Sequence, residues 1–446
     1  AAKYSLQNQA VKLLPSERVR FCLRHRVDAT KGIEVRYNQK REQAHYSNVQ
    51  RCGSVWTCPI CSAQISEGRR QELKQGMEYW QGLGDWKETG GGVYLLTLTN
   101  PHHQGDNLVQ LLEGQKKALH RFWTLRKSRE MFKALGKVGH ITATEVTHGV
   151  NGWHPHYHIL LFFKKPINSK SLRNFLATCW QNCCEKSGLK VPSLEHGCDL
   201  RDGKYADKYV SKWGLADEVT KGHIKKGKEG SATPWDLLRQ SEEGCEQSGR
   251  LFQVFAEAFK GKRQLSWSKG LKSLLQVDEV TDEQLAEVTE KDSVEVDILA
   301  MELWRLILRY KSRADYLKAK EHDMKFGSER ADNLIMTLAE RYTKDYVHEL
   351  MANADLHNVH QWTQDFVSDS PAAERYAETA ARISEALAFM KACGIGRDSA
   401  PSLEAVDFFT SGEAAPDWVE AIAEDGNATP FADFFTPLTG ITVPLS

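Results

Sequence analysis

The chain has 446 residues, of which 41% are hydrophobic and 26% are charged, and its formal net charge is zero. This length allows two or three domains. No stretch approaches the roughly 18 consecutive apolar residues of a membrane span, and residues 1–20 lack the pattern of a signal peptide. We therefore expect a soluble cytoplasmic protein with no membrane partner.

The charge is unevenly distributed along the chain. Residues 1–280 hold 44 Lys and Arg against 28 Asp and Glu, whereas residues 281–446 hold 15 against 31. A basic region of this size favours a polyanionic partner such as nucleic acid. We expect the acidic region to meet another protein or to screen the basic surface rather than to bind DNA.

The cysteines near the start of the chain predict a zinc site. Ten cysteines in a cytosolic chain favour metal ligands or buried thiols over disulfides. Three of them lie close together: Cys52, Cys58 and Cys61. We predict Cys22 as the fourth ligand of a closed, structural four-thiolate site, with His25 or His45 as substitutes. The alternative is a set of reduced buried thiols, and core packing is our interpretation for Cys179, Cys183 and Cys184.

The polar and apolar pattern predicts an alternation of helices and strands. In chain order we expect a helix over 66–80, a strand over 93–99, a helical stretch over 107–134, strands over 141–147 and 155–163, a helix over 169–187 and a short strand over 194–200. The turn at 149–152 would join the second and third strands into a hairpin.

The later part of the chain has weaker signals. Residues 217–250 are rich in Lys, Gly, Glu and Ser and are predicted to be a mobile loop, although Thr233-Pro-Trp-Asp236 has the sequence of a helix start. Beyond 281 we expect helices, because apolar residues recur at spacings of three and four. These residues are Val294, Ile298, Met301, Trp304 and Leu308.

Two histidines on the expected strand 155–163 are placed to share a metal ion. His156 and His158 are two residues apart, so their side chains project from the same face of a strand. The hairpin would bring Glu145 close to both, which makes it the predicted third ligand of a divalent ion. The alternative is a satisfied histidine pair near a sheet edge. His154 would be a supporting group or a DNA contact.

Two tyrosines follow about fifty residues later. Tyr205 and Tyr209 are four residues apart, so on the helix that we expect there they share one face. A tyrosine hydroxyl has a pKa of roughly 10, so it needs a nearby metal or cation to act as a nucleophile. Lys208, on the same helix, would reach a phosphate from the side. The alternative is an amphipathic helix whose tyrosines pack against the sheet.

Taken in order, these motifs resemble those of the HUH (His-hydrophobic-His) rolling-circle replication initiators. They are Leu95-Leu-Thr-Leu-Thr99, His154-Pro-His-Tyr-His158 and Tyr205-x-x-Lys208-Tyr209-x-x-Lys212. The two-tyrosine form is similar to initiators of small single-stranded DNA phages and to rolling-circle transposases. The segments 52–61 and Trp267-Ser-Lys-Gly-Leu271 resemble bacterial plasmid initiators. The resemblance covers about residues 20–275.

The resemblance implies an α+β fold, in which a central antiparallel sheet carries the metal ligands and the tyrosine helix packs across it. Residues 1–88 would be a basic, zinc-binding segment and residues 89–280 the nicking-joining domain. From their charge and apolar spacing, residues 281–446 would be an acidic, mainly α-helical C-terminal domain. The catalytic metal would be Mg²⁺ or Mn²⁺, bound by Glu145, His156 and His158.

The implied activity is site-specific nicking of single-stranded or melted origin DNA. One tyrosine would form a 5′-phosphotyrosyl link and leave a free 3′-OH, and the strand would be rejoined after replication. The chain lacks a Gly-x-x-x-x-Gly-Lys-Ser/Thr loop, so a host helicase and the host replication machinery are the expected partners. The candidate DNA contacts are basic: Arg69, Arg70, Lys116, Lys117, Lys212, Lys262 and Arg263. Two alternatives stay open, a two-tyrosine HUH single-strand transposase and a non-catalytic, zinc-bearing DNA-binding regulator.

Overall fold

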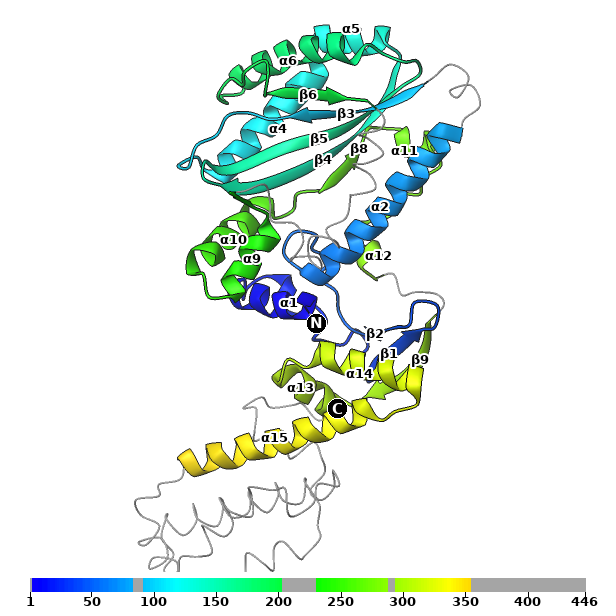
Figure 1. Ribbon diagram of the computed structural model, residues 1–446, viewed down its shortest axis with the longest axis vertical. Helices are drawn as coiled ribbons and strands as arrows, with labels where there is room; N and C mark the ends of the chain where they lie inside the picture. Colours follow the sequence, from blue (N-terminus) through cyan, green and yellow to red (C-terminus); the bar gives the residue numbers. More distant parts are fainter. Residues whose placement is uncertain (1, 83–90, 203–229, 288–292, 354–446) are drawn as a thin grey trace, which may run out of the picture. The chain divides into compact units, whose positions relative to one another are not determined.

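The computed structural model describes residues 2–82, 91–202, 230–287 and 293–353 (Figure 1). The chain divides into two compact units. The first consists of Ala1–His25 and Gln50–Val288, and the second of Arg26–Val49 and Thr289–Ser446. Within the described ranges, no helix has the length and apolar character that crossing a bilayer requires.

The first unit is built on an antiparallel sheet. Its strands are β3 (Gly92–Leu98), β4 (Lys137–Gly149), β5 (Gly152–Phe163), β6 (Cys198–Arg201), β7 (Ser231–Ala232) and β8 (Leu265–Trp267). The strand order is β6-β3-β5-β4-β7, and β8 also pairs with β4. The long strand β5 therefore lies between β3 and β4, with antiparallel pairing on both sides. The expected combination of helices with an antiparallel sheet is confirmed.

The predicted hairpin is present and fixes which residues face each other. Gly149 pairs with Gly152 at the turn, and Glu145 pairs with His156. Gly152 has a φ of +81°, and a Cβ there would lie 2.9 Å from the backbone of the segment after β3. A side chain at this position would therefore be strained and would clash.

Three helices cover one face of this sheet (Figure 1). They are α4 (Leu108–Thr124), α5 (Arg126–Ala134) and α6 (Ser169–Glu185). Asn107 and Asn168 cap the first and third of them by accepting backbone N–H hydrogen bonds. The buried cluster beneath these helices includes Phe122 of α4, Trp180 of α6 and Tyr157 of β5.

The opposite face of the sheet packs against α2 (Pro59–Gly82) and α11 (Leu271–Leu274). Its cluster includes Trp80 of α2 together with Leu160 and Phe162 of β5. Because successive residues of a strand point to opposite faces, β5 contributes to both clusters, with Tyr157 on the first face and Leu160 on the second.

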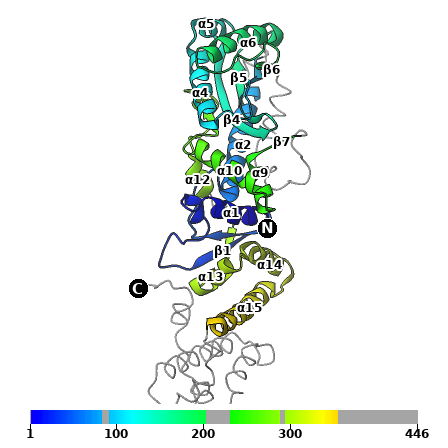
Figure 2. The ribbon, with the colours of Figure 1, turned by 90° about the vertical axis from the view of Figure 1, so that its left-hand side faces the viewer.

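The other helices among the described residues of the first unit are α1 (Ala2–Leu13), the short 3₁₀ helix η1 (Arg18–Arg20), α9 (Pro234–Glu242), α10 (Glu246–Phe259) and α12 (Asp282–Glu287). Thr233 and Asp236 form the reciprocal capping box that starts α9, as its sequence predicts. The expectation of a loop over 217–250 is wrong for α9 and the start of α10, because both bury apolar residues. Both views show α1 beside α9 (Figures 1 and 2), and the amide of Gln9 donates to Ser241 Oγ at 2.8 Å.

In its described residues, 26–49 and 293–353, the second unit contains a small antiparallel sheet and three helices. Its elements are β1 (Ile33–Asn38), β2 (Gln43–Ser47), β9 (Ser293–Leu299), α13 (Met301–Arg309), α14 (Arg313–Phe326) and α15 (Arg330–Asn353). The strand order is β2-β1-β9. Val294 and Ile298 were expected on a helix and lie on β9, so that prediction is wrong. The run from 293 to 299 alternates β-branched and acidic residues, which favours a strand, and the helical pattern begins only at Met301.

Candidate metal centres

Glu145, His156 and His158 lie together on one face of the sheet. The pairing of β4 with β5 places Glu145 directly opposite His156. Nε2 of each histidine lies 3.5 Å from Oε2 of Glu145. Two ligands at roughly 2.1 Å from one ion are about 3 Å apart when they subtend a right angle, so only a small adjustment would admit an ion. The three residues could therefore hold a metal.

The second nitrogen of each imidazole has its own partner. Nδ1 of His156 lies 3.2 Å from the carbonyl oxygen of His154, and Nδ1 of His158 lies 3.0 Å from Oγ1 of Thr97 on β3. A carbonyl oxygen only accepts, so His156 donates through Nδ1 and keeps the lone pair of Nε2 for a metal. Thr97 belongs to one of the sequence motifs, but the sequence alone assigned it no role.

The charges around Glu145 favour its ionised form. Burial by itself would raise the pKa of this carboxyl, but hydrogen bonds and charge interactions with His156 and His158 hold the pKa well below its ordinary value. Burial, together with His156 and His102, lowers the pKa of His154 to about 4. His102 also stacks on His154, with ring centroids 4.7 Å apart. An ionised carboxylate between imidazoles is a suitable donor set for a divalent cation.

Gln115 of α4 supports the backbone of β5 from the other side of the sheet. Its side chain is fully buried, and its amide donates to the carbonyl of Pro155 at 2.7 Å and to Oδ1 of Asn100 at 2.6 Å. The pairing of β5 with β3 ends at Tyr157, so Gln115 satisfies a carbonyl beyond the last pair. Sequence reasoning missed this residue, although a polar residue within the apolar stripe of an amphipathic helix was a usable signal.

The four predicted zinc ligands also lie together, and all are buried: Cys22, Cys52, Cys58 and Cys61. Cys22 Sγ lies 3.4 Å from Cys61 Sγ and 3.6 Å from Cys58 Sγ. Four sulfurs in a tetrahedron at about 2.3 Å from one ion would be about 3.8 Å apart. The spacing therefore suits a four-thiolate metal site. Cys22 completes the group, so neither His25 nor His45 is needed as a ligand.

Gln7 of α1 contacts the cysteine group. Nothing in the sequence indicated this contact. Its fully buried amide nitrogen lies 3.4 Å from Cys58 Sγ and 3.2 Å from the carbonyl oxygen of Cys22. Burial alone would raise the pKa of the Cys58 thiol, but hydrogen bonds from the surrounding cysteines, including the backbone N–H of Cys61, hold this pKa well below its usual value. A thiolate with amide donors around it is suited to metal ligation.

The other cysteines that were expected to be core residues are confirmed as such. They lie in the buried cluster beneath the three covering helices: Cys179, Cys183 and Cys184. Burial raises the pKa of Cys184 to about 12, so this thiol stays protonated. It acts as a small apolar side chain.

The predicted DNA contacts of α2 are engaged in ion pairs. Arg69 donates to Glu72 at 2.8 Å and to Asp282 at 2.6 Å, and its side chain is only 13% exposed. Arg70 forms an ion pair with Glu67 at 2.5 Å. The pair with Asp282 joins α2 to α12, and the other two pairs lie within α2. A DNA-binding role for either arginine stays a prediction.

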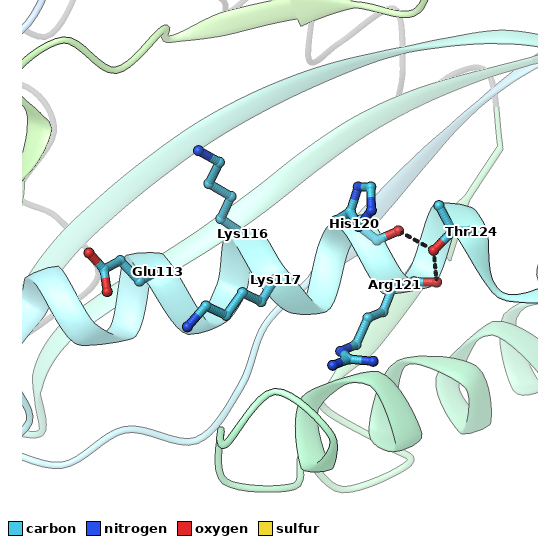
Figure 3. A pocket seen from close by; sticks show the side chains of 6 residues that line it. All are labelled: Glu113, Lys116, Lys117, His120, Arg121 and Thr124. Atoms are coloured by element: carbon cyan, nitrogen blue, oxygen red, sulfur yellow. Dashed lines mark hydrogen bonds between the residues drawn. The ribbon is translucent and has the colours of Figure 1, made fainter.

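Lys116 and Lys117 lie on the exposed side of α4, beside a shallow hollow (Figure 3). Arg263 is exposed just before β8, and Lys262 is half-buried, its carbonyl accepting a hydrogen bond from the indole of Trp56 at 2.6 Å. The remaining predicted site residues lie outside the described residues: Tyr205, Lys208, Tyr209 and Lys212.

The end of the chain resembles a different class of protein. Residues 333–424 match the class-II DAHP synthetase family. A 61-residue segment is 51% identical to a phospho-2-dehydro-3-deoxyheptonate aldolase of Streptomyces coelicolor, covering 14% of this chain and 13% of that enzyme. No solved structure matches the chain.

The larger part of the chain resembles replication proteins. A protein named "Protein rep" of Streptomyces lividans is 27% identical over 300 residues, covering 52% of this chain and 64% of that protein. A "Neomycin resistance protein" of Streptomyces cyanogenus is 31% identical over 136 residues, covering 25% and 30%. The chain thus spans less than two thirds of the length of either relative. The model of the replication protein family (Rep_1) matches residues 43–316. Because this match spans more than half of the sequence, the chain belongs to the replication protein family.

Proposed function

We propose that this protein is a rolling-circle replication initiator of the HUH class, which nicks one strand at a plasmid origin and later rejoins it. The observation that carries the proposal is the group formed by Glu145, His156 and His158, in which both Nε2 atoms face one carboxylate oxygen. Membership of the replication protein family supports a DNA substrate. The basic composition of residues 1–280 supports the same substrate class.

The described residues would supply the metal site for the reaction. Glu145, His156 and His158 would hold Mg²⁺ or Mn²⁺, which would neutralise charge on the scissile phosphate. Thr97 and the carbonyl of His154 fix the orientation of the two imidazoles. Three protein ligands leave coordination positions for substrate oxygens, as a catalytic rather than a structural site requires.

Tyr205 and Tyr209 are the proposed nucleophiles, with Lys208 as the cation beside the phosphate. The phenolate oxygen of one tyrosine attacks phosphorus, the P–O3′ bond breaks, and the 3′-oxygen takes up a proton to become a free 3′-OH. In the second step a 3′-hydroxyl of DNA attacks the phosphorus of the phosphotyrosine and the P–O bond to tyrosine breaks. The tyrosine leaves as a phenolate and takes up the proton that the hydroxyl gives up. Each phosphodiester is exchanged for another ester of similar energy, so no nucleotide triphosphate is consumed.

The strands on either side of the segment that holds Tyr205 and Tyr209 support this assignment. The chain enters the segment from β6, which pairs with β3, and leaves it into β7, which pairs with His148 and Gly149 of β4. Both ends are therefore attached to the sheet that carries Glu145, His156 and His158. The four-cysteine group, with zinc bound, is proposed to be structural, and a host helicase is the proposed partner for unwinding.

The test is the formation of a protein–DNA adduct that survives denaturation. The full chain is incubated with Mn²⁺ and single-stranded oligonucleotides that tile the origin, and the products are separated on a denaturing gel. We expect one oligonucleotide to give an adduct that the Glu145→Gln and His156→Ala variants lose. The His196→Ala variant removes a strongly exposed histidine and should keep the adduct.

The tyrosine variants separate the roles of the two nucleophiles. If both act, Tyr205→Phe and Tyr209→Phe each retain an adduct, and only the double variant loses it. Loss with one single change would disprove the alternating mechanism. If the wild-type protein binds origin DNA but forms no adduct on any part of it, the protein is a non-catalytic DNA-binding regulator and the nicking proposal is wrong.

A further inference from the structure

The exposed side of α4 and α5 is strongly basic. Besides Arg126, six cations are exposed on it: Lys116, Lys117, Arg121, Lys127, Arg129 and Lys133. The exposed acids of the two helices are Glu113 and Glu130, and Glu130 is paired with Arg126 at 2.7 Å. Within the described ranges, none of the six cations forms an ion pair with a carboxylate. Their charge is therefore not neutralised locally, and it favours a polyanion.

This surface lies on the side of the sheet opposite the candidate metal group. The inner side of α4 packs, through Ala118 and Phe122, in the same buried cluster as Tyr157 of β5. His156 and His158 flank Tyr157 on the strand, so they project from the other face. A strand bound at the metal group therefore does not lie on the outer side of α4. The basic surface serves a second stretch of nucleic acid or a different ligand.

The side chains on α4 form two rows of potential phosphate contacts (Figure 3). Lys116 and His120 point to one side of the helix, and Lys117 and Arg121 point to the other. Each row has the i, i+4 spacing of residues stacked on a helix face, a separation of about 6 Å along the axis. With Glu113 and Thr124 they line a hollow of about 840 Å³.

The chemistry of this surface suits phosphates and not unpaired bases. Among the described residues, α4 and α5 have no exposed Phe, Tyr or Trp side chain, and His120 is their one exposed ring. The indole of Trp123 is already stacked on His140, with ring centroids 4.0 Å apart, and Lys137 lies over it at 4.4 Å. Proteins that hold single strands usually offer aromatic rings for base stacking, whereas Lys and Arg alone bind the backbone of a duplex without reading its sequence.

We propose that the outer face of α4 and α5 binds the phosphate backbone of double-stranded DNA, independently of sequence, on the side of the sheet opposite the metal group. The inference rests on the proposed function, which supplies DNA as the substrate. It adds a second contact: the duplex next to the nick site is held on one side while the exposed strand is cut on the other.

The experiment compares two triple variants of the full chain with equal loss of charge. The test variant is Lys116→Ala/Lys117→Ala/Arg121→Ala, and the control is Lys12→Ala/Arg18→Ala/Lys269→Ala, which removes exposed cations outside α4 and α5. Fluorescence anisotropy measures binding to a blunt 30-base-pair duplex that lacks the origin, at several salt concentrations. Circular dichroism melting verifies that both variants fold.

We expect the test variant to bind the duplex at least tenfold more weakly at 100 mM salt. The slope of log K against log salt should fall by about 2.7, because each lost phosphate contact contributes about 0.9. The control variant should change both the duplex affinity and the salt slope less than the test variant does. Adduct formation on a short single-stranded oligonucleotide should be unchanged in the test variant, since that strand lies on the other face.

Three results would overturn the inference: duplex binding and slope equal to those of the control, equal losses of duplex binding and of adduct, or competition by single-stranded DNA as strong as that by duplex. The outcome is separable from that of the proposed function. A wild-type protein without an adduct, whose duplex binding still depends on α4, would disprove nicking and keep this surface. A protein that forms the adduct, but whose duplex binding does not depend on the α4 cations, would support nicking and disprove the proposed duplex contact.

Discussion

The amide of Gln115 donates a 2.7 Å hydrogen bond to the carbonyl of Pro155, the residue between His154 and His156. This bond ties the buried side of α4 to the strand that presents two candidate metal ligands. Because Pro155 has no N–H of its own, its carbonyl is the group through which this residue can be anchored. Gln115 is thus a positioning residue, and it acts through the backbone of β5.

Replacing Gln115 should therefore affect both stability and metal binding. The Gln115→Leu variant leaves the Pro155 carbonyl and Asn100 without their donor, which should lower the free energy of unfolding by about 1–3 kcal/mol. Mn²⁺ affinity, measured by titration calorimetry, should fall severalfold. Gln110→Leu, on the exposed side of the same helix, is the matched control. If Gln115→Leu and the control have the same free energy of unfolding and the same Mn²⁺ affinity, Gln115 does not have this role.

Thr97 offers a test of the metal group that leaves every ligand in place. Thr97→Val has nearly the same shape but removes the hydroxyl that lies 3.0 Å from Nδ1 of His158. Loss of such a supporting contact typically lowers metal affinity by about 10- to 100-fold. We expect a change of this size in calorimetric Mn²⁺ binding, and none for Thr124→Val on the exposed side of α4. An unchanged affinity would show that Thr97 does not orient the imidazole.

The cysteine group leads to two predictions, one about how much zinc the protein binds and one about how fast it releases the metal. Metal analysis of Cys58→Ser should show the loss of one equivalent of zinc. Gln7→Leu should retain the metal but release it faster to a chelator, because Cys58 loses the donor at 3.4 Å. Gln247→Leu, an exposed glutamine, should exchange like the wild-type protein. If Gln7→Leu exchanges no faster, the contact to Cys58 has no influence on the metal.

His140 should contribute to acid sensitivity. Burial, reinforced by Lys137, lowers its pKa to about 3. Between this value and the roughly 6.5 of an unfolded histidine, the unfolded chain binds one more proton, so stability falls as the pH falls through this window. His140→Phe keeps a ring against Trp123 and removes the titration. The slope of unfolding free energy against pH should decrease by about 1.4 kcal/mol per pH unit between pH 6 and 4.

The control for that prediction is His120→Phe, an exposed histidine on α4. It should leave the pH dependence close to that of the wild-type protein. Identical slopes for His140→Phe and the wild-type protein would show that His140 is protonated in the folded state at these pH values. Chemical denaturation followed by tryptophan fluorescence gives the required free energies.

Local patterns in the sequence were sufficient for the hairpin and for the residues that it brings together. A turn of known length fixes the register of two antiparallel strands, and a period of two fixes the face. Glu145 could therefore be placed opposite His156 from spacing alone. The start of α9 was predictable for a similar reason, because the capping box of Thr233 and Asp236 involves only residues three apart.

Contacts between distant parts of the chain could not be predicted in this way. The spacing of Val294 and Ile298 fits a helix face as well as alternate positions of a strand, and only the pairing with β1, more than 250 residues earlier, decides between them. Arg69 is basic by composition, but its carboxylate partner Asp282 lies 213 residues away. Gln115 is polar in sequence and buried in the fold because a carbonyl on another element accepts its hydrogen bond.

The position of β1 between β2 and β9 determines how the protein can be shortened. A fragment that ends before residue 293 keeps β1 but deprives it of β9, and this leaves an open strand edge that invites aggregation. A fragment that ends before residue 293 should therefore omit residues 26–49 as well. The backbone N–H of Gln50 donates to the carbonyl of His25 at 2.7 Å, and that of Leu23 donates to the carbonyl of Gln50 at 2.7 Å. The two cut ends are already neighbours, so a linker of a few residues can join them.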